Sequence, residues 1–266
     1  MIRKFAESDR SALQALLLVA PELNIYMLGN LAALGTDHEI SEFWGDFGPD
    51  HKLRGAVNRY MRGWSIFGNP DADWAGLAAI LDAHSLPAER LQDNPGGIPS
   101  ILPYLRAYTA ARIDIDELMT LAAPNFRPSA PPPAITVRAA HAGDLDALAD
   151  FYANADTMQR SRTGVERPLQ DGYLWIAESD GEICSTALTN AVGAGYAMIG
   201  GVYTPPAWRG HGLSQAVCSA LCAALLANDL IPALYWVAPD AGHIYHKLGF
   251  KPVGSWRSVR LMPHPK

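Results

Sequence analysis

The sequence has few cysteines, and their number is odd. Cys184, Cys218 and Cys222 are the only three in 266 residues, so they do not form a disulfide framework. Cys218 and Cys222 lie one helical turn apart, with no histidine at metal-ligand spacing beside them. We interpret them as small buried apolar residues rather than as ligands or nucleophiles. The sequence therefore predicts a reducing, cytoplasmic location and no metal.

The chain also lacks an excess of positive charge and any long apolar run. Its net charge is −6 and its pI about 5.7, which excludes the broad basic surface that sequence-independent nucleic-acid binding needs. The most apolar stretch, residues 12–20, ends at Pro21 and is shorter than the roughly 18 residues of a membrane span. No charged and then apolar leader opens the chain. We expect neither nucleic acid nor a membrane as a partner, so any phosphate must be held locally.

Prolines are concentrated between residues 123 and 133. Prolines at this density have no amide hydrogen for a sheet and favour an extended path, so this segment is typical of a semi-rigid linker. We predict an N-terminal domain over residues 1–123, a linker over 124–134 and a C-terminal domain over 135–266. Two domains also fit the length of the chain.

The two halves begin with similar patterns. Arg3 and Asp9 recur as Arg138 and Asp144, and each pair is followed at the same offset by Ala-Leu. Both segments predict a short strand, a turn, an aspartate near a helix start and an amphipathic helix. We interpret the similarity as a duplication, with chance as the alternative.

Hydrophobic patterning predicts strands and helices in both halves. In the first half we expect strands at residues 42–47 and 53–67 and a helix at 71–83. In the second we expect strands at 173–178, 183–190, 196–203 and 233–237, helices at 213–227 and 240–248, and a final hairpin at 253–261. A turn at Ser179-Asp180-Gly181 joins two of these strands, and Gly249 closes the last helix. This mixture indicates an α+β fold with a central mixed sheet.

One segment combines a strand end, glycines and a helix start. It reads Gly201-Val202-Tyr203-Thr204-Pro205-Pro206-Ala207-Trp208-Arg209-Gly210-His211-Gly212-Leu213-Ser214. Glycine lets successive amides turn to one side, and a helix start adds unpaired N–H groups at the positive end of the helix dipole. Such an arrangement suits a diphosphate. The alternative is an ordinary tight connection between a strand and a helix.

Two motifs resemble signatures of the GNAT superfamily of N-acetyltransferases. Arg209-x-x-Gly212-x-Ser214 is similar to Q/R-x-x-G-x-G/A, and the VYTPP run before it most resembles a bacterial, two-lobed branch of the superfamily. Residues 238–250 (APDAGHIYHKLGF) resemble the second signature, N-x-x-A-x-x-L-Y-x-x-x-G-F, and place Tyr245 at its tyrosine. The resemblance covers about residues 135–261. It implies an acyl-CoA N-acyltransferase fold and, with the repeat, two tandem GNAT-like domains of which the first is degenerate.

The resemblance also implies which residues bind acetyl-CoA or another acyl-CoA as co-substrate. Main-chain groups of Val202, Tyr203 and Thr204 would pair with the pantetheine arm like an added strand. The amides that would hold the pyrophosphate belong to six residues: Gly210, His211, Gly212, Leu213, Ser214 and Gln215. For Arg209, contact with a phosphate and plain solvation stay open as alternatives.

Tyr245 is the implied catalytic residue, positioned to protonate the leaving thiolate. A phenol has a pKa near 10, so it stays protonated at neutral pH and donates a hydrogen bond to a thiolate. Two departures from the family pattern are Ser214 in place of Gly or Ala and Ala238 in place of Asn. Residues 196–201 contain no carboxylate, so the sequence identifies no general base.

The first half carries no comparable phosphate loop. Its corresponding segment, residues 67–74, contains Asp71 and Asp73 where a diphosphate would sit, and like charges there oppose binding. We therefore expect the N-terminal domain to have lost the cofactor site.

These observations predict an acetyl-CoA-dependent N-acetyltransferase that acts on the primary amine of a small molecule or of an amino-acid-like acceptor. One alternative is a non-catalytic acyl-CoA-binding or interaction module, suggested by Ala238 and by the missing base. Another is transfer of a longer acyl or an aminoacyl group. The oligomeric state stays open, with a homodimer as one alternative.

Overall fold

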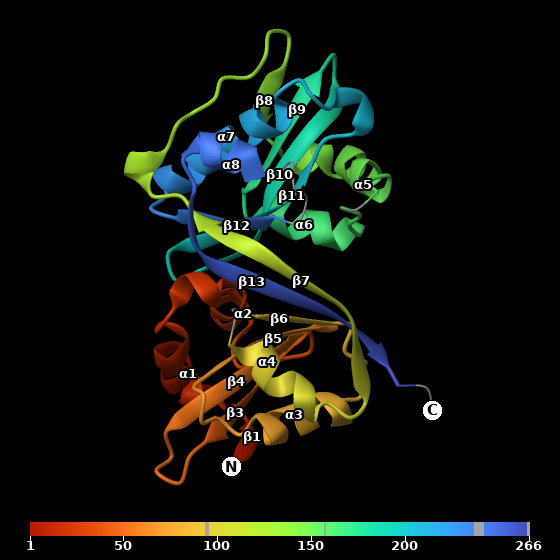
Figure 1. Cartoon of the computed structure of the whole chain (residues 1–266). Helices are drawn as coiled ribbons and strands as arrows, with labels where there is room; N and C mark the ends of the chain where they lie inside the picture. The colour runs from red at the N-terminus through yellow and green to blue at the C-terminus, as the bar shows by residue number, and fades with distance from the viewer. Residues whose placement is uncertain (94–95, 157, 237–241, 265–266) are drawn as a thin grey trace. The chain divides into compact units, whose positions relative to one another are not determined.

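The chain divides into two compact units in the computed structural model, which describes residues 1–93, 96–156, 158–236 and 242–264 (Figure 1). Unit 1 comprises Met1–Leu118 together with Val253–Lys266, and unit 2 comprises Met119–Pro252. The division differs from the predicted boundaries because the last strand of the chain joins the first unit. Within the described ranges, no helix is long and apolar enough to cross a membrane.

Unit 1 is a sheet with helices packed against it. Its elements are β1 (Ile2–Lys4), α1 (Arg10–Leu17), α2 (Ile25–Leu34), β2 (Asp37–His38), β3 (Ser41–Phe47), β4 (Leu53–Tyr60), β5 (Gly63–Gly68), α3 (Trp74–Ala83), β6 (Arg90–Asp93), α4 (Gly97–Ile101), β7 (Tyr108–Thr120) and β13 (Lys251–Pro263). Neighbouring strands follow the order β1-β3-β4-β5-β6-β13-β7. Only the β5–β6 pair among those with a described register is parallel.

Two predicted elements of unit 1 are corrected. The single strand expected at residues 53–67 is a hairpin, since Met61 adopts φ 53° and turns the chain so that Tyr60 pairs with Gly63. The helix expected from residue 71 begins at Trp74, because the Asp73 carboxylate accepts a hydrogen bond from the Gly76 amide and caps its first turn.

Unit 2 repeats most of this succession of strands and helices, without a counterpart of the short strand β2 among its described residues. Its elements are β8 (Thr136–Ala139), α5 (Leu145–Ala153), α6 (Arg162–Gln170), β9 (Leu174–Ser179), β10 (Glu182–Gly193), β11 (Tyr196–Tyr203), α7 (Leu213–Ala227), β12 (Ile231–Trp236) and α8 (Gly242–Leu248). The strands follow the order β12-β11-β10-β9-β8, with β11 and β12 parallel and the other pairs antiparallel. This confirms the predicted α+β class.

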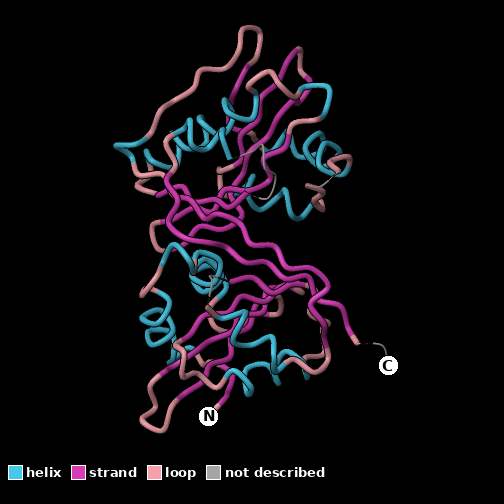
Figure 2. Tube along the Cα trace, in the orientation of Figure 1, coloured by secondary structure: helices cyan, strands magenta, loops and turns pink. Residues whose placement is uncertain are grey.

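Two apolar layers lie on opposite faces of the unit 2 sheet (Figures 1 and 2). On one face, Val217 and Leu221 of α7 pack with Ala187 of β10. On the other, Leu148 of α5 packs with Leu188, the next residue along the same strand. Neighbouring residues of a strand point to opposite faces, so the apolar run in β10 predicts a sheet covered on both sides.

The duplication expected from the sequence is present in the structure as a repeated ion pair. The Arg3 guanidinium donates to both carboxylate oxygens of Asp9, at 2.6 and 2.9 Å. Arg138 does the same to Asp144, at 2.8 and 2.9 Å. In each unit the aspartate also accepts from the amide three residues before it. These planar, two-bond pairs fix the turn between the first strand and the first helix.

The last strand overturns the prediction of a final hairpin at residues 253–261. β13 is one continuous strand that pairs antiparallel with β6, matching Val259 with Leu91. Val259 and Leu261 lie in the core of unit 1, and the Trp256 ring lies 5.6 Å from that of Tyr26. The apolar positions of β13 therefore complete the first unit rather than folding back on themselves.

Part of the predicted proline-rich linker is attached to unit 2. The Arg127 amide donates to the Leu248 carbonyl at 3.0 Å, and the Ser129 amide donates to the Ser219 hydroxyl at 2.8 Å. Gly249, at φ 101°, closes α8 as predicted, and a Cβ there would lie only 1.9 Å from the Asn125 carbonyl oxygen. Residues 240 and 241 of the predicted helix lie outside the described residues.

Candidate functional site

The site begins at an irregularity in β11. Thr186 pairs with Tyr203 and Leu188 with Gly200, so β11 uses one residue more than β10 over this stretch. The extra residue forms a bulge at Gly201, which adopts φ 57°. A Cβ at this residue would lie 2.9 Å from both Leu188 and the Tyr152 hydroxyl, which leaves room for glycine alone.

The bulge is held by hydrogen bonds to the Gly201 carbonyl. The Tyr152 hydroxyl donates to it at 2.6 Å and the Thr186 hydroxyl at 3.2 Å. Tyr152 is fully buried, and burial raises the pKa of its phenol to about 12. This tyrosine is therefore a fixed donor that orients the main chain next to Val202.

Beyond Met198, β11 separates from its parallel neighbour. The two strands pair from Tyr196 with Ile231 to Met198 with Ala233, and within the described residues the remainder of β11 has no partner in β12. A strand whose edge is released in this way offers main-chain donors and acceptors to an extended ligand. Val202, Tyr203 and Thr204 lie on this released stretch or directly after it.

The loop after β11 leads into α7 with its amides unoccupied. Gly210 and Gly212 have φ 82° and 76°, in the left-handed region that favours glycine. No acceptor in the described part of the chain bonds any of the six successive main-chain amides from Gly210 to Gln215. Gly212 has no side chain to cap the helix, so these donors lie at the positive helix end without a partner among the described residues.

Side chains around the loop fix its path. The Arg209 Nε donates to the Thr204 carbonyl at 2.9 Å, and its Nη2 lies 3.6 Å from Asp156. The Thr204 and Ser185 hydroxyls are 2.8 Å apart. His211 is exposed, with its Nδ1 3.3 Å from the Trp208 carbonyl. Arg209 therefore connects two points of the loop through its hydrogen bond to Thr204, and its side chain, about half exposed, also faces solvent.

Other predicted site residues contribute main chain rather than side chains. Leu213 is buried beside Ala177 and Cys184 and anchors the start of α7. Tyr203 is buried, with its ring 5.5 Å from that of Phe151. Val202, Ser214 and Gln215 are half-buried. The structure therefore brings the predicted residues together along one continuous main-chain path.

Tyr245 lies on α8 in the apolar layer that also contains α7. Its ring is 6.0 Å from that of Phe250, and its hydroxyl has no hydrogen-bond partner among the described residues. Burial, followed by the nearby Cys218 and Cys222 thiols, raises the pKa of this phenol well above its usual value. The hydroxyl therefore stays protonated and has its hydrogen available. Ala238, which stands in place of the family's asparagine, lies outside the described residues.

The cysteines show no sign of activation. All three are buried, and burial raises the pKa of the Cys218 thiol to about 12. The Cys184 thiol donates to the Ala177 carbonyl at 3.1 Å. A thiol with a raised pKa is a poor nucleophile at neutral pH.

Three polar residues beside the bulge were not predicted as part of the site. They are Tyr152, Arg160 and Asn190, which come from α5, the segment before α6, and β10. No motif contains them, since their proximity arises only when three separate segments fold together.

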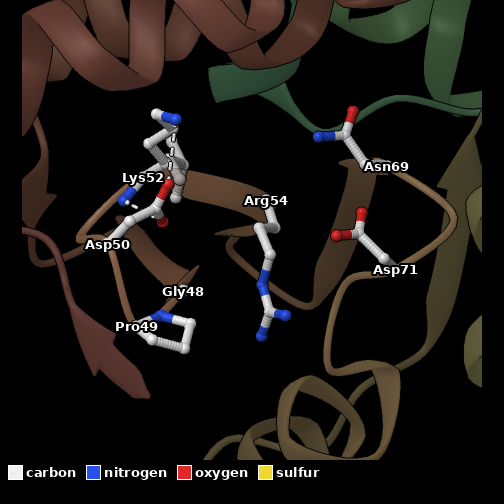
Figure 3. Close-up of a pocket in the computed structure, with 8 residues that line it drawn as sticks. Gly48, Pro49, Asp50, Lys52, Arg54, Asn69 and Asp71 are labelled. Atoms are coloured by element: carbon white, nitrogen blue, oxygen red, sulfur yellow. Dashed lines mark hydrogen bonds and ion pairs between the residues drawn. The ribbon is translucent and has the colours of Figure 1, made fainter.

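The corresponding helix start of unit 1 is already occupied. The Gly76 amide is bonded by Asp73, and the Asp73 amide donates to Asp46 at 2.8 Å. A cavity of about 500 Å³ lies beside it, between the β3–β4 turn and the residues after β5 (Figure 3). Its Arg54 pairs with the fully buried Asp46 at 2.8 Å. In unit 1, carboxylates of the chain itself therefore bind the donors at this helix start.

The other charges of this cavity oppose a polyanion as well. Lys52 pairs with Asp50 at 2.9 Å, and Asp71 faces the cavity from the other side, across Arg54 (Figure 3). The positive groups that line the cavity are thus balanced by carboxylates of the same chain.

Comparison with known proteins gives a family match for the second half. A sequence model of the family described as GNAT acetyltransferase matches residues 164–259. This segment contains β11, the loop, α7 and α8. No curated protein matches the chain.

Solved structures match over the whole length. A Drosophila protein superposes with a TM-score of 0.75 at 16% identity, covering 99% of each chain. A GCN5-related N-acetyltransferase from Sphaerobacter thermophilus gives 0.69 at 20% identity, covering 99% of this chain and 95% of that one. A tandem GNAT protein from the clavulanic acid biosynthesis pathway gives 0.67 at 15% identity, covering 100% and 99%. The fold is that of tandem GNAT-like domains, and the family match supports the resemblance seen in the sequence.

Proposed function

We propose that the chain is an acetyl-CoA-dependent N-acetyltransferase that acts on the primary amine of a small molecule. Unit 2 carries the reaction, and unit 1 has lost the equivalent cofactor site. The six unoccupied amides from Gly210 to Gln215, directly after a bulged and released strand, are the observation that supports this most. The buried, unpaired thiols fit a cytoplasmic location.

The site suits the diphosphate of a coenzyme A thioester. Six consecutive N–H donors lie at the positive end of a 15-residue helix, and residues 204–215 contain no carboxylate that would repel a polyanion. Arg209 is half exposed at the edge of the same loop. This local arrangement explains how a protein of net charge −6 would hold a polyanionic co-substrate.

Direct transfer requires little from the side chains. The bound thioester supplies an acyl carbon that a neutral amine attacks: the C–N bond forms, the C–S bond breaks and its electron pair leaves on sulfur. Main-chain donors near Val202, oriented by the bulge, would stabilise negative charge on the acyl oxygen. The Tyr245 hydroxyl, protonated and without another partner among the described residues, would donate its hydrogen to the departing sulfur. The attacking nitrogen would release its surplus proton to solvent, and the Tyr245 oxygen would regain one from solvent, so that amide, thiol and phenol are all neutral at the end.

No side chain is assigned as general base. The nearest neighbours of Gly201 are Leu188, Tyr152, Arg160 and Thr186, and none of these accepts a proton at neutral pH. The amine would then enter already neutral. The rate should rise with pH through the pKa of the acceptor amine.

The proposal is tested by thioester consumption over a panel of primary amines, with mass spectrometry of the acetylated product. We expect turnover with at least one amine and release of coenzyme A thiol in equal amount. Binding of acetyl-CoA without turnover would instead favour the non-catalytic acyl-CoA-binding module. The absence of binding at millimolar acetyl-CoA would contradict both.

A further inference from the structure

Arg160 is held in a fixed position beside the bulge of unit 2. Its Nη2 donates to the Asn190 side-chain oxygen at 2.8 Å, and its guanidinium carbon lies 5.7 Å from the centre of the Tyr152 ring. Arg167 donates to the main-chain oxygen of the same Asn190. Two arginines therefore converge on one residue of β10.

Arg160 has no counter-ion of its own within the described residues, although it is half-buried. Its Nε is enclosed without an acceptor, and its Nη1 has no acceptor there either and is reached by solvent. Two other arginines of unit 2 are paired with carboxylates: Arg138 binds two of them, and Arg162, two residues along, binds Asp146 at 2.6 Å. A partly desolvated guanidinium without a carboxylate is costly, and an anionic ligand would relieve that cost.

The guanidinium lies beside the bulge that precedes the stretch assigned to the thioester arm. The Arg160 Nε is 3.0 Å from the position that a Cβ on Gly201 would take, and Asn190 is closer still to the corresponding position on Gly200. Val202, which follows Gly201, begins the stretch assigned to the thioester arm. A group bound by Arg160 would therefore belong to a molecule that also reaches the reacting carbon.

We propose that Arg160 binds a carboxylate of the acceptor, so that the substrate is an amine that also bears a carboxylate. The inference rests on the proposed function, because it takes Val202–Thr204 as the thioester side of the site. With Nε enclosed and one Nη2 hydrogen on Asn190, the Nη1 group and the second Nη2 hydrogen are left to match a carboxylate with two parallel hydrogen bonds. Asn190 and the Tyr152 ring keep the arginine in place before the substrate arrives.

The test compares amino acids with their own carboxamides under saturating acetyl-CoA. In the unmodified protein we expect kcat/KM to favour the acid by about 10- to 100-fold, the range of a charge-assisted hydrogen bond. Arg160→Gln should lower the rate with the acid by that factor and leave the amide within about twofold. Its Kd for acetyl-CoA should not change. Arg162→Gln, which removes a neighbouring exposed arginine, should keep the preference.

Other outcomes would overturn the inference. These are equal rates for acid and amide in the unmodified protein, or an equal loss of both in Arg160→Gln with unchanged thermal stability. Assays with aminoalkyl phosphonates distinguish an acceptor that bears a carboxylate from one that bears a phosphate-type group. Preference for the phosphonate would contradict the proposal as stated. Arg160→Lys, which keeps the charge but not the two-bond geometry, should retain part of the preference and serves as a second folded variant.

The inference also has a readout that does not need turnover. Calorimetry with N-acetyl amino acids and N-acetyl amino-acid amides, in the presence of coenzyme A, measures product binding directly. We expect the acids to bind more tightly and Arg160→Gln to lose that difference. If no amine is acetylated but the acids bind through Arg160, the proposed function fails and the carboxylate site stands. If amines are acetylated and Arg160→Gln has no effect, the proposed function stands and the carboxylate site fails.

Discussion

Helices α3 and α7 occupy the same place in their units but begin in opposite ways. Each follows a strand that pairs antiparallel with its predecessor and parallel with its successor. The residue before α3 is Asp73, whose carboxylate binds a first-turn amide. The residue before α7 is Gly212, which has no side chain for that purpose. One helix end is capped by a carboxylate of its own chain, while the other has no such cap among the described residues.

The same difference extends into the preceding strand. The β4–β5 pair has a regular register from Gly55 with Gly68 to Tyr60 with Gly63, whereas the β10–β11 pair is bulged. The ion pairs Arg3–Asp9 and Arg138–Asp144 are nevertheless alike. The two GNAT-like units thus share this structural contact, and among the described residues the bulged strand and the uncapped helix start occur in unit 2.

Trp256→Ala should give the largest effect and should act on unit 1 although Trp256 is near the end of the chain. Its ring is buried in that unit, so we expect a loss of about 3–5 kcal/mol in the free energy of unfolding of unit 1. Hydrogen exchange with mass spectrometry would locate the loss. Phe250→Ala, in the core of unit 2, is the matched control. Equal loosening of both units by Trp256→Ala would contradict the assignment of β13.

Tyr245→Phe should lower kcat by about 100-fold or more while leaving the Kd for acetyl-CoA unchanged. The hydroxyl has no partner in the described residues, so its removal should not lower the melting temperature by more than about 2 °C. α4, at the corresponding place in unit 1, has no tyrosine. Steady-state kinetics and calorimetry check both parts. An unchanged kcat would remove Tyr245 from the mechanism.

Ser214→Glu should weaken acetyl-CoA binding by about tenfold and at the same time stabilise the fold slightly. A carboxylate in the first turn of α7 favours the helix dipole by about 0.3–1 kcal/mol but repels a diphosphate at the same amides. Ser214→Gln is the neutral control and should show neither effect. Opposite signs of the two changes, measured by calorimetry and thermal unfolding, would be difficult to obtain from misfolding. Unchanged affinity would place the diphosphate elsewhere.

The smallest expected effect is on stability at low pH, which should change in the same way in the two units. Hydrogen bonds from Arg3 and Arg138 lower the pKa of Asp9 and of Asp144 to about 2. The unfolded carboxyl has a pKa near 3.9, so this stability is complete above about pH 4 and is lost as pH falls toward 2. Asp9→Asn and Asp144→Asn should each lower the free energy of unfolding by about 1 kcal/mol at pH 7. Each should also make that free energy depend less on pH in acid. A pH-independent cost would contradict the ionic origin.

Much of unit 2 was predictable because its signals are local. The bounds of β11 and α7 agree with the predicted residues 196–203 and 213–227, since apolar periodicity sets both elements and Gly212 marks the helix start. The turn at Asp180 and Gly181 was also predictable, because the Asp-Gly pair favours turns that need positive φ, and both residues adopt it.

Non-local features could not be predicted in the same way. The apolar residues of β13 fit any sheet edge, so nothing near Val259 indicates that its partner is Leu91. The surroundings of the Arg160 side chain include Asn190 and Gly201, which lie far along the chain. The roles of the amides from Gly210 to Gln215 stay a prediction that requires a ligand.

Amide-resolved hydrogen exchange with and without acetyl-CoA tests the central comparison most directly. The account predicts slowed exchange at residues 210–215 and no change at residues 74–77 of α3. Unchanged exchange at residues 210–215, or equal protection at both helix starts, would contradict the claim that unit 2 alone binds the thioester.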